Sequence, residues 1–496
     1  MSSILFFSRE NLPQLYGRLS GYISNTELIH VAYSQAEAKV LKSFGIVPDY
    51  IYLDMFRTVY DGLVLSDDLL AAVDKDIITQ SEGRMNLNEA IQSDRGFSLL
   101  SYEESLRSAA AHYIVWEKIF AEHHVDVLEH EACSLFFNYI AAILCKKQGG
   151  CYTFQIAIKN DTDDYAYLNA NNGEYDFYEL RSNFIKYINN PDLINRERCG
   201  AFIKKFREDK TVFLGNLVRR NEPITKLFFS SLKERYKESK ETTRFDRIYS
   251  NIEYWSYHNK VITNKYNNLR DYRKKRIQFE ADIPEGEKYF FYPFHLEPEA
   301  VVQYLADGIY KNQVKLIENI AASLPSGCYL YVKDHPHITA YRKAEDYERL
   351  MKVPNIRLLD PRIPAKVLVN NAIGVITING TAGMEALLMG KQVYCFGTCM
   401  YSFVPRVNYL RNIRDLRECI YKNINVKYED NDELYAFVMA YLISSHPGYF
   451  NAFFGGFKIP GFDNDKNARL IAVELEQYAA SINDFKCAID RLKDES

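Results

Sequence analysis

The stretch that decides the fold is Gly374-Val-Ile-Thr-Ile-Asn-Gly-Thr-Ala-Gly-Met-Glu-Ala-Leu-Leu-Met389. Its apolar and β-branched beginning predicts a buried strand at Gly374–Ile378. Its end predicts a helix at Met384–Met389, and the small residues between the two predict a tight turn whose backbone can approach an anion. A strand, a small-residue turn and a helix in this order are typical of a parallel α/β sheet, in which ligands bind where the strands end.

The same alternation continues on both sides of this stretch. In the carboxyl half, short apolar runs predict strands at 288–293, 329–332, 356–359 and 393–396, with helices near 299–324, 344–351 and 365–370. In residues 1–195, strands are predicted at 4–7, 28–32, 50–53, 125–128 and 152–158, with helices near 12–23, 35–44, 102–120 and 133–147. The fold class that follows is α/β, with two Rossmann-like domains facing a cleft.

Charge is distributed unevenly along the chain. The 496 residues have a formal net charge of −4, but residues 196–276 hold 22 Lys/Arg against 10 Asp/Glu, a local charge of +12. This stretch has few helix breakers, so we expect a basic, mostly helical insert. The predicted division is an N-terminal domain at 1–195, the insert at 196–284, a second domain at 285–464, and a C-terminal helix at 465–496 that crosses back to the first domain.

Composition excludes several classes of protein. The chain is 47% hydrophobic and 25% charged, which is ordinary for a globular protein, and no apolar run approaches the roughly 20 residues of a membrane helix. The amino end meets charge after a short apolar run, which predicts a first strand and not a signal peptide. Nine scattered cysteines without C-x-x-C spacing favour a reduced, cytoplasmic protein without structural zinc.

Two loops at predicted strand ends carry residues suited to a nucleotide. In the first, Asn379 to Gly383 lead into a helix whose first turn holds Glu385, and this carboxylate suits ribose hydroxyls better than a phosphate. In the second, Lys333-Asp-His335-Pro336 places a histidine where it can donate to a leaving phosphate oxygen.

A third loop, with Glu297 and Pro298, follows strand 288–293. All three loops also have structural explanations, as turns or helix starts with an acid placed to suit the helix dipole. The dipeptide His446-Pro447, in a loop flanked by serine and glycine, shows how readily His-Pro occurs by itself. Only the presence of three such loops on one sheet edge favours a binding site.

Taken in order, these motifs resemble a known family. The segments Tyr292-Pro-Phe-His-Leu-Glu-Pro-Glu-Ala300, Tyr331-Val-Lys-Asp-His-Pro336 and Val375-Ile-Thr-Ile-Asn-Gly-Thr-Ala-Gly-Met-Glu-Ala386, followed by Phe396-Gly397 and Tyr401, look like bacterial capsular polysaccharide biosynthesis proteins. That family includes the Kdo transferases of capsule assembly, which are similar in layout to GT-B glycosyltransferases. The resemblance covers about residues 288–410.

The resemblance implies a site for a CMP-activated sugar in the second domain. His335 would approach the donor phosphate, Glu385 would hold the ribose, and the neighbouring donor-binding residues would be Lys333, Pro336, Asn379, Gly380, Thr381, Ala382, Gly383 and Tyr401. Where the Kdo transferases carry Gln-Pro, this chain has Glu297-Pro298, and an acid there meets the carboxylate of a keto-acid sugar with like charge. That departure leaves the identity of the donor sugar open. The expected donor is CMP-Kdo or a related CMP-activated ulosonic acid. No metal or cofactor is expected to be required.

A base or nucleophile is expected from the first domain, because the acceptor hydroxyl must lose a proton as the sugar is transferred. Glu129 and Glu131, just past strand 125–128, are the candidates, and an acidic helix start is the alternative explanation. Asp161-Thr-Asp163 suggests instead a metal-bound diphosphate, as in GT-A transferases. A polar turn running on through Asn169 to Asn172 explains that motif as well.

The predicted function is a glycosyltransferase of capsular or surface polysaccharide synthesis that acts on a glycan or lipid-linked acceptor. Two alternatives stay open, a nucleotide-sugar epimerase-like hydrolase and a non-catalytic binding protein of a polysaccharide assembly complex. Residues 196–276 could contact an anionic membrane surface, or could be solvated helices, and nucleic acid is not an expected partner. The predicted location is the cytoplasm, at the inner face of the cell membrane.

Overall fold

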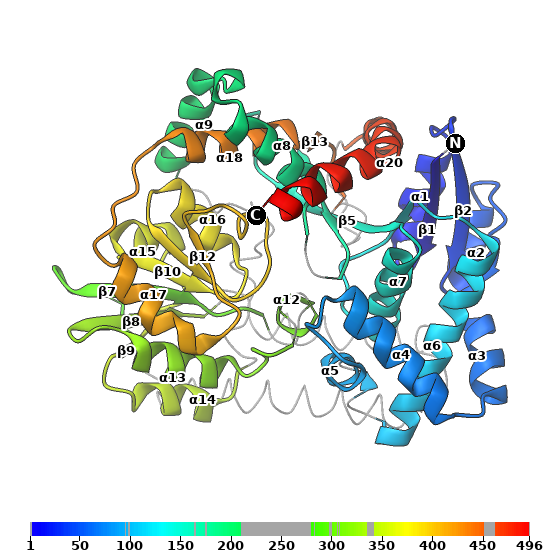
Figure 1. Ribbon diagram of the computed structural model, residues 1–496, viewed down its shortest axis with the longest axis horizontal. Helices are drawn as coiled ribbons and strands as arrows, with labels where there is room; N and C mark the ends of the chain where they lie inside the picture. Colours follow the sequence, from blue (N-terminus) through cyan, green and yellow to red (C-terminus); the bar gives the residue numbers. More distant parts are fainter. Residues whose placement is uncertain are drawn as a thin grey trace.

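The computed structural model describes residues 2–94, 96–97, 100–162, 165–173, 176–209, 279–281, 283–296, 300–304, 306, 308–334, 342–450 and 462–495. Within them lie two β-sheets with helices packed beside each (Figure 1). Four candidates from the sequence, Glu297, Pro298, His335 and Pro336, lie outside the described residues, as does most of the predicted basic insert.

The first sheet has seven strands in the order β13-β6-β5-β4-β1-β2-β3. Five of them are parallel: β1 (Ser2–Ser8), β2 (Thr26–Ala32), β3 (Tyr50–Ile51), β4 (Val127–Glu129) and β5 (Cys151–Ile158). Two are antiparallel to their neighbours: β6 (Ala166–Asn171) and β13 (His446–Pro447).

These two antiparallel strands correct the sequence analysis. The asparagines of β6 were expected in a polar turn, but Asn169 pairs with Gln155 and Asn171 with Thr153 across the sheet. All four side chains are buried. The polar side chains of β6 therefore have partners on β5, which is why the segment is a strand despite its composition.

The second sheet has six strands in the order β12-β11-β10-β7-β8-β9, all parallel. They are β7 (Lys288–Pro293), β8 (Cys328–Lys333), β9 (Ile356–Leu359), β10 (Gly374–Thr377), β11 (Gln392–Cys395) and β12 (Val407–Tyr409). Read in chain order within each half, β1 to β6 and β7 to β12 both follow the 3-2-1-4-5-6 order of the Rossmann fold. The predicted α/β class with two Rossmann-like halves is confirmed.

This strand order fixes where ligands are expected. The connections reverse direction between β1 and β4 in the first sheet, and between β7 and β10 in the second. At such a switch point the loops after the two central strands diverge to opposite faces and leave a crevice at the carboxyl ends. The sequence-derived candidates Glu129 and Asn379 follow or end a strand at these two points.

The helices of the amino half are α1 (Leu12–Ser20), α2 (Gln35–Lys42), α3 (Tyr52–Gly62), α4 (Asp67–Gln80), α5 (Leu87–Ser93), α6 (Tyr102–Glu122), α7 (Phe136–Lys147), α8 (Tyr178–Asn189) and α9 (Arg196–Glu208). Those beyond β7 are α12 (Ala300–Gln303), α13 (Gln313–Ser323), α14 (Ala344–Met351), α15 (Ala365–Asn371), α16 (Thr381–Leu388), α17 (Leu416–Asn423), α18 (Asp432–Ile443) and α20 (Asn464–Glu495). Short 3-10 turns lie at Pro191–Leu193 and Ile413–Asp415.

Several predicted elements need correction; the helix predicted at 133–147, for example, begins at Phe136, and the helix predicted at 12–23 ends at Ser20. The single helix expected at 299–324 is two helices, α12 and α13, because Gly308 has a φ of 62° and Asn312 caps the start of α13 by accepting from the Lys315 amide. The strand expected at 50–53 ends at Ile51, and α3 begins at the next residue, Tyr52. The helix expected to start at Met384 starts at Thr381.

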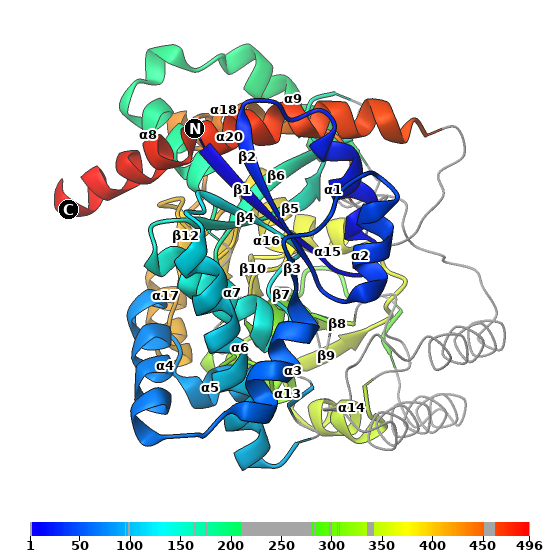
Figure 2. The ribbon, with the colours of Figure 1, turned by 90° about the vertical axis from the view of Figure 1, so that its right-hand side faces the viewer.

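Helices α18 and α20 return to the first sheet. Both pack against α8, and α20 also packs against α1 (Figures 1 and 2). One face of the first sheet is covered in this way, in a buried cluster where Ile4 and Phe6 of β1 meet Ile471 and Leu475 of α20. The domain boundaries at 195, 284 and 464 stay a prediction. Strand β13 lies within the predicted second domain, residues 285–464, but it joins the first sheet.

No helix in the part of the chain that the structure describes is long and apolar enough to span a membrane.

Candidate functional site

His295 marks the switch point of the second sheet. It follows β7, and its ring reaches across to β10, where Nε2 lies 3.1 Å from Thr377 Oγ1 and accepts the Ile378 amide at 3.2 Å. Because that amide can only donate, Nε2 is the acceptor and the neutral ring carries its proton on Nδ1. Gln313 of α13 fixes the His295 backbone, accepting its N–H at 2.8 Å and donating to its carbonyl at 3.1 Å.

The turn after β10 is the amino end of α16. Gly380 is the residue before the helix, and Thr381 to Gly383 already form its first turn, so this stretch is a helix start and not the free loop expected. A Cβ on Gly380 would lie 3.0 Å from His295 Cε1, and one on Gly383 would overlap the Tyr401 hydroxyl. That hydroxyl donates to the Gly380 carbonyl. Close packing therefore requires glycine at 383 and leaves little room for a side chain at 380.

The side chain of Asn379 has no hydrogen-bond partner among the described residues, although the residue is only 7% exposed. Neither its amide nitrogen nor its carbonyl oxygen is paired. A buried, unsatisfied amide costs about 1–3 kcal/mol, so such a group calls for a ligand or water to complete it. It lies just before α16, whose first N–H groups attract anions.

Glu385 is a second buried side chain with an unpaired polar atom. It is 7% exposed, and its Oε2 has no hydrogen-bond partner in the described part of the chain. Burial raises its pKa to about 7, against the lowering effect of Lys366, Lys333 and Lys159. It lies beyond the first turn of α16, so the explanation by helix-dipole complementation is weaker than the sequence suggested.

Lys333 ends β8 on the same edge of the sheet. It is 6% exposed, and its Nζ donates to the Pro361 carbonyl at 3.4 Å. The next residue, Asp334, is 2% exposed and accepts a hydrogen bond from the Tyr347 hydroxyl, with Arg342 Nε 3.8 Å from its carboxylate. The charge of Lys333 lowers the pKa of Glu385, against the effect of burial, while His335 lies outside the described residues.

In the first sheet, Glu129 is the last residue of β4 and is completely buried. Its Oε2 accepts from Gln155 Nε2 at 3.0 Å, and Gln155 in turn donates to Asn169 Oδ1 at 3.3 Å. Burial raises the pKa of Glu129 well above its usual range. The other carboxyl oxygen, Oε1, has no hydrogen-bond partner among the described residues.

Glu131 differs from Glu129 in exposure and pairing. Its side chain is 20% exposed and forms an ion pair with Arg9, the residue after β1. Between the two acids, His130 donates from Nδ1 to the Phe7 carbonyl at 2.7 Å, and its Nε2 lies 3.9 Å from Glu131 Oε1. Burial lowers the pKa of His130. Helix α7 begins only at Phe136, so the explanation of these acids as a helix start is wrong.

Asp161 is occupied by a salt bridge. Arg198 Nε lies 2.6 Å from Asp161 Oδ2 and donates to it, and this hydrogen bond lowers the pKa of the carboxyl. Asp163 lies outside the described residues. Across the described ranges, no group of three or more His, Cys, Asp and Glu side chains is arranged to hold a metal ion.

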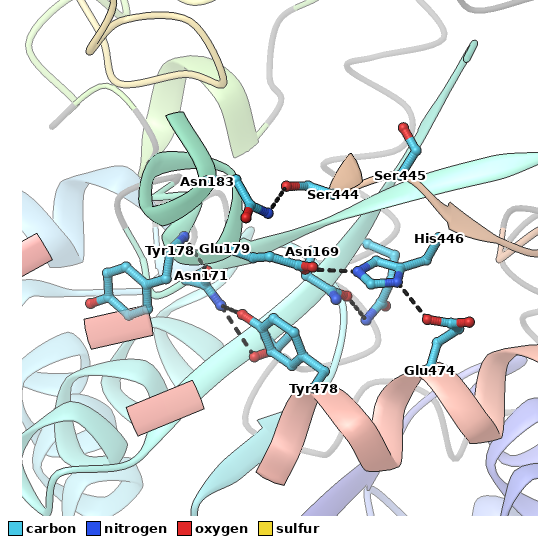
Figure 3. A network of polar contacts seen from close by, with 12 residues as sticks. Asn169, Asn171, Tyr178, Glu179, Asn183, Ser444, Ser445, His446, Glu474 and Tyr478 are labelled. Carbon is cyan, nitrogen blue, oxygen red and sulfur yellow. Dashed lines mark hydrogen bonds and ion pairs between the residues drawn. The ribbon is translucent and has the colours of Figure 1, made fainter. Parts of the chain in front are cut away.

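The second His-Pro dipeptide is not in a simple loop. His446 lies in β13, with Nε2 2.7 Å from Glu179 of α8 and Nδ1 2.8 Å from Glu474 of α20 (Figure 3). Burial opposes its charge, but the two carboxylates outweigh burial and raise its pKa to about 9. His446 therefore connects β13, α8 and α20. Because it has this structural role, its His-Pro dipeptide does not show how often such a dipeptide occurs without a role.

Three residues of the site were missed by the sequence analysis: His295, Lys159 and Lys366. His295 and Lys159 each follow a strand, so the rule that found Lys333 would have found them too. Lys366 lies within α15 and reaches the site only through packing, so no local signal marks it.

Fold and site together define a protein with two Rossmann-order sheets and buried polar groups at both switch points. Residues 203–406 match the model of a family described as Capsule polysaccharide biosynthesis protein. The resemblance to capsular polysaccharide biosynthesis proteins, which rested on motifs between Tyr292 and Tyr401, is thereby confirmed.

Similarity to individual proteins is partial. The chain is 28% identical over 130 residues to Protein FixF of Sinorhizobium fredii (strain NBRC 101917 / NGR234), which is 26% of this chain and spans only 30% of FixF. The KpsC beta Kdo 2,4 transferase of Thermosulfurimonas dismutans is 14% identical, covering 70% of this chain and 87% of its own, with a TM-score of 0.31. The UDP-GlcNAc 2-epimerase of Methanocaldococcus jannaschii, in complex with UDP-GlcNAc and UDP, is 12% identical over 89% and 99% of the chains, with a TM-score of 0.27. TM-scores this low do not bear on function.

Proposed function

We propose that this protein is a glycosyltransferase of capsular or surface polysaccharide biosynthesis that binds a nucleotide-sugar donor at the β7/β10 switch point. The family match over residues 203–406 supports the biosynthetic role. The observation that carries the donor site is the pair of buried, incompletely bonded side chains there, Asn379 and Glu385. Polar groups of this kind, at the switch point of a Rossmann-order sheet, are complementary to a polar ligand.

Each part of the donor has a suitable partner at this edge. The amino end of α16 and the ammonium group of Lys333 suit the phosphate, because both favour negative charge. The Glu385 carboxylate can accept hydrogen bonds from ribose hydroxyls, and Asn379 can donate and accept at the same time. Stabilisation of the departing phosphate by these groups would not require a metal. The donor type we propose is a CMP-activated ulosonic acid.

For the first domain we favour Glu131 over Glu129 as the base or nucleophile. Both lie at the β1/β4 switch point, but Glu129 is completely buried, and that burial raises the pKa of its carboxyl. Glu131 is partly exposed and paired with Arg9, which keeps a carboxylate in a fixed orientation. A reacting group must reach the acceptor hydroxyl, and only the exposed acid can do so without rearrangement.

The donor site is tested by thermal unfolding of the full chain with CMP, UDP and GDP in parallel. We expect CMP to raise the melting temperature most, because a ligand present at 100 times its Kd stabilises the folded state by about 2.7 kcal/mol. A larger shift with UDP or GDP would contradict the CMP donor. No shift with any of the three would contradict the enzyme itself.

A further inference from the structure

The Glu131 carboxylate is held through only one of its two oxygens. Arg9 Nη1 donates to Oε1, Asn138 Nδ2 of α7 lies 3.5 Å from the same oxygen, and His130 Nε2 lies 3.9 Å from it. The Tyr152 hydroxyl of β5 fixes the backbone by donating to the Glu131 carbonyl at 2.5 Å. None of these contacts involves Oε2. Because the side chain is 20% exposed, Oε2 is the oxygen open to a ligand.

Two side chains around Oε1 have unpaired atoms, and both atoms are hydrogen-bond acceptors. Asn138 and His130 are completely buried, and neither Asn138 Oδ1 nor His130 Nε2 has a hydrogen-bond partner in the part of the chain that the structure describes. His130 Nδ1 donates to the Phe7 carbonyl, so the neutral ring has its lone pair on Nε2. Burial and the charge of Arg9 lower the pKa of His130, which disfavours the protonated ring. Since unpaired buried acceptors are costly, this place calls for groups that donate.

The charged side chains connected to Glu131 are mostly acids. Arg9 Nη2 lies 3.2 Å from Glu10 Oε1, and Glu37 Oε1 accepts the Glu10 backbone amide at 3.2 Å. One guanidinium and three carboxylates give this connected set a formal charge of −2. Arg9 offers little to a further anion, because Nη1 and Nη2 are both paired with carboxylates and its guanidinium carbon lies 5.5 Å from the centre of the Phe137 ring.

We propose that the subsite around Glu131 binds a neutral, hydroxyl-bearing sugar of the acceptor and disfavours a sugar that carries a carboxylate or a phosphate. This inference rests on the proposed glycosyltransferase function and adds the chemical class of the acceptor sugar. Ionised carboxylates accept hydrogen bonds and cannot donate them, so sugar hydroxyls suit Glu131 Oε2 and the Glu10 side chain, which is 42% exposed. An anionic sugar would meet like charge at both acids.

Saturation-transfer difference NMR on the whole chain, with CMP in every sample, tests this preference. The probes are the methyl glycosides of glucose, galactose and mannose, each paired with the methyl glycoside of the corresponding uronic acid. The members of a pair differ only in a hydroxymethyl group or a carboxylate at C6. In at least one pair, we expect the neutral member to bind about five-fold more tightly than the acid, because like charges at this distance repel even in a partly solvated site.

Glu10→Gln is the variant that tests the cause. It removes one negative charge and keeps an acceptor oxygen, so the preference for the neutral sugar should fall to about two-fold. The matched control is Glu82→Gln, because Glu82 has the same φ of 54° as Glu10 and its side chain is 53% exposed against 42%. Glu82 lies 3.8 Å from Lys146, so its substitution also removes the acid of a charge pair, and the preference should stay unchanged.

The outcomes separate this inference from the proposed function. If the uronic acid glycosides bind as tightly as the neutral ones, the charge class of the acceptor is wrong. If Glu10→Gln and Glu82→Gln change the preference equally, the acids around Glu131 are not its source and the subsite is wrong. If CMP binds and no glycoside does, the subsite is wrong and the donor site stands. If CMP does not bind either, the proposed function itself fails.

Discussion

At the residue scale, the sequence pointed to those candidate site residues that stand out from their immediate neighbours. Gly380 to Gly383, Glu385 and Lys333 follow apolar runs, and strand ends are where ligands bind in parallel sheets. Lys366 could not be found in this way, because its contacts with Phe206 and Asp209 join parts of the chain that only folding brings together. The burial of Glu129 and the partial exposure of Glu131 likewise depend on packing, not on spacing.

Gly383 gives a prediction at this scale. Gly383→Ala should destabilise the fold by about 1–3 kcal/mol, because the new methyl group would overlap Tyr401, which is 1% exposed and has no room to move. It should also abolish the thermal shift with nucleotide, since Tyr401 would leave the Gly380 carbonyl. Urea unfolding measures the first effect.

Gly200→Ala is the control for this substitution. Gly200 lies inside α9, and a Cβ there would meet nothing within 4 Å. Alanine at that position should stabilise by up to about 1 kcal/mol. Equal stability of Gly383→Ala and Gly200→Ala would contradict the packing described at the α16 amino end.

At the element scale, the apolar parallel strands were predictable, whereas the polar antiparallel strands and the short parallel strand β12 were not. Strand β7 has the predicted bounds, because its six residues form an almost continuous buried apolar run. Strand β13 has only two residues. It is held in place by the His446 ring, whose two nitrogens form hydrogen bonds with Glu179 and Glu474. A strand held by partners far away in sequence leaves no periodic pattern to read.

His446 gives a prediction on pH. Its pKa is about 9 in the folded chain against 6.5 unfolded, so its contribution to stability is fully present below pH 6.5 and is lost as pH rises through 9. His446→Gln should therefore cost about 3 kcal/mol at pH 6 and much less at pH 9.5. Urea unfolding at both pH values measures this difference.

The matched control is His124→Gln, because His124 is 74% exposed and lies 3.2 Å from Asp126. An exposed pair contributes little, so its substitution should change stability only slightly at either pH. A cost of His446→Gln that is the same at pH 6 and pH 9.5 would show that the ion pairs with Glu179 and Glu474 are not its source.

At the scale of the whole molecule, the first sheet is completed by the far end of the chain. Ile471, Leu475 and Ile482 of α20 are buried on the face of β1 and β4. The sequence predicted a helix that crosses back, since its apolar residues recur at helical spacing. It could not predict which face the helix covers, because that depends on the strand order.

A shortened chain tests this arrangement. A chain that ends at residue 463 should lose the folded first domain and aggregate, because each large buried side chain of α20 contributes about 2 kcal/mol and native stability is only about 5–15 kcal/mol. A chain that ends at residue 490 keeps the buried face of α20 and should stay folded. Gel filtration and circular dichroism distinguish the two. A monomeric, cooperatively melting chain ending at 463 would contradict the role of α20.

The return of α20 to β1 has a consequence for synthesis. Strand β1 leaves the ribosome before helix α20, and the whole second sheet is made in between. During that interval the nascent first domain exposes an apolar surface that would otherwise attract other chains. Translation speed and chaperone supply should therefore affect the yield of this protein more than its final stability would suggest.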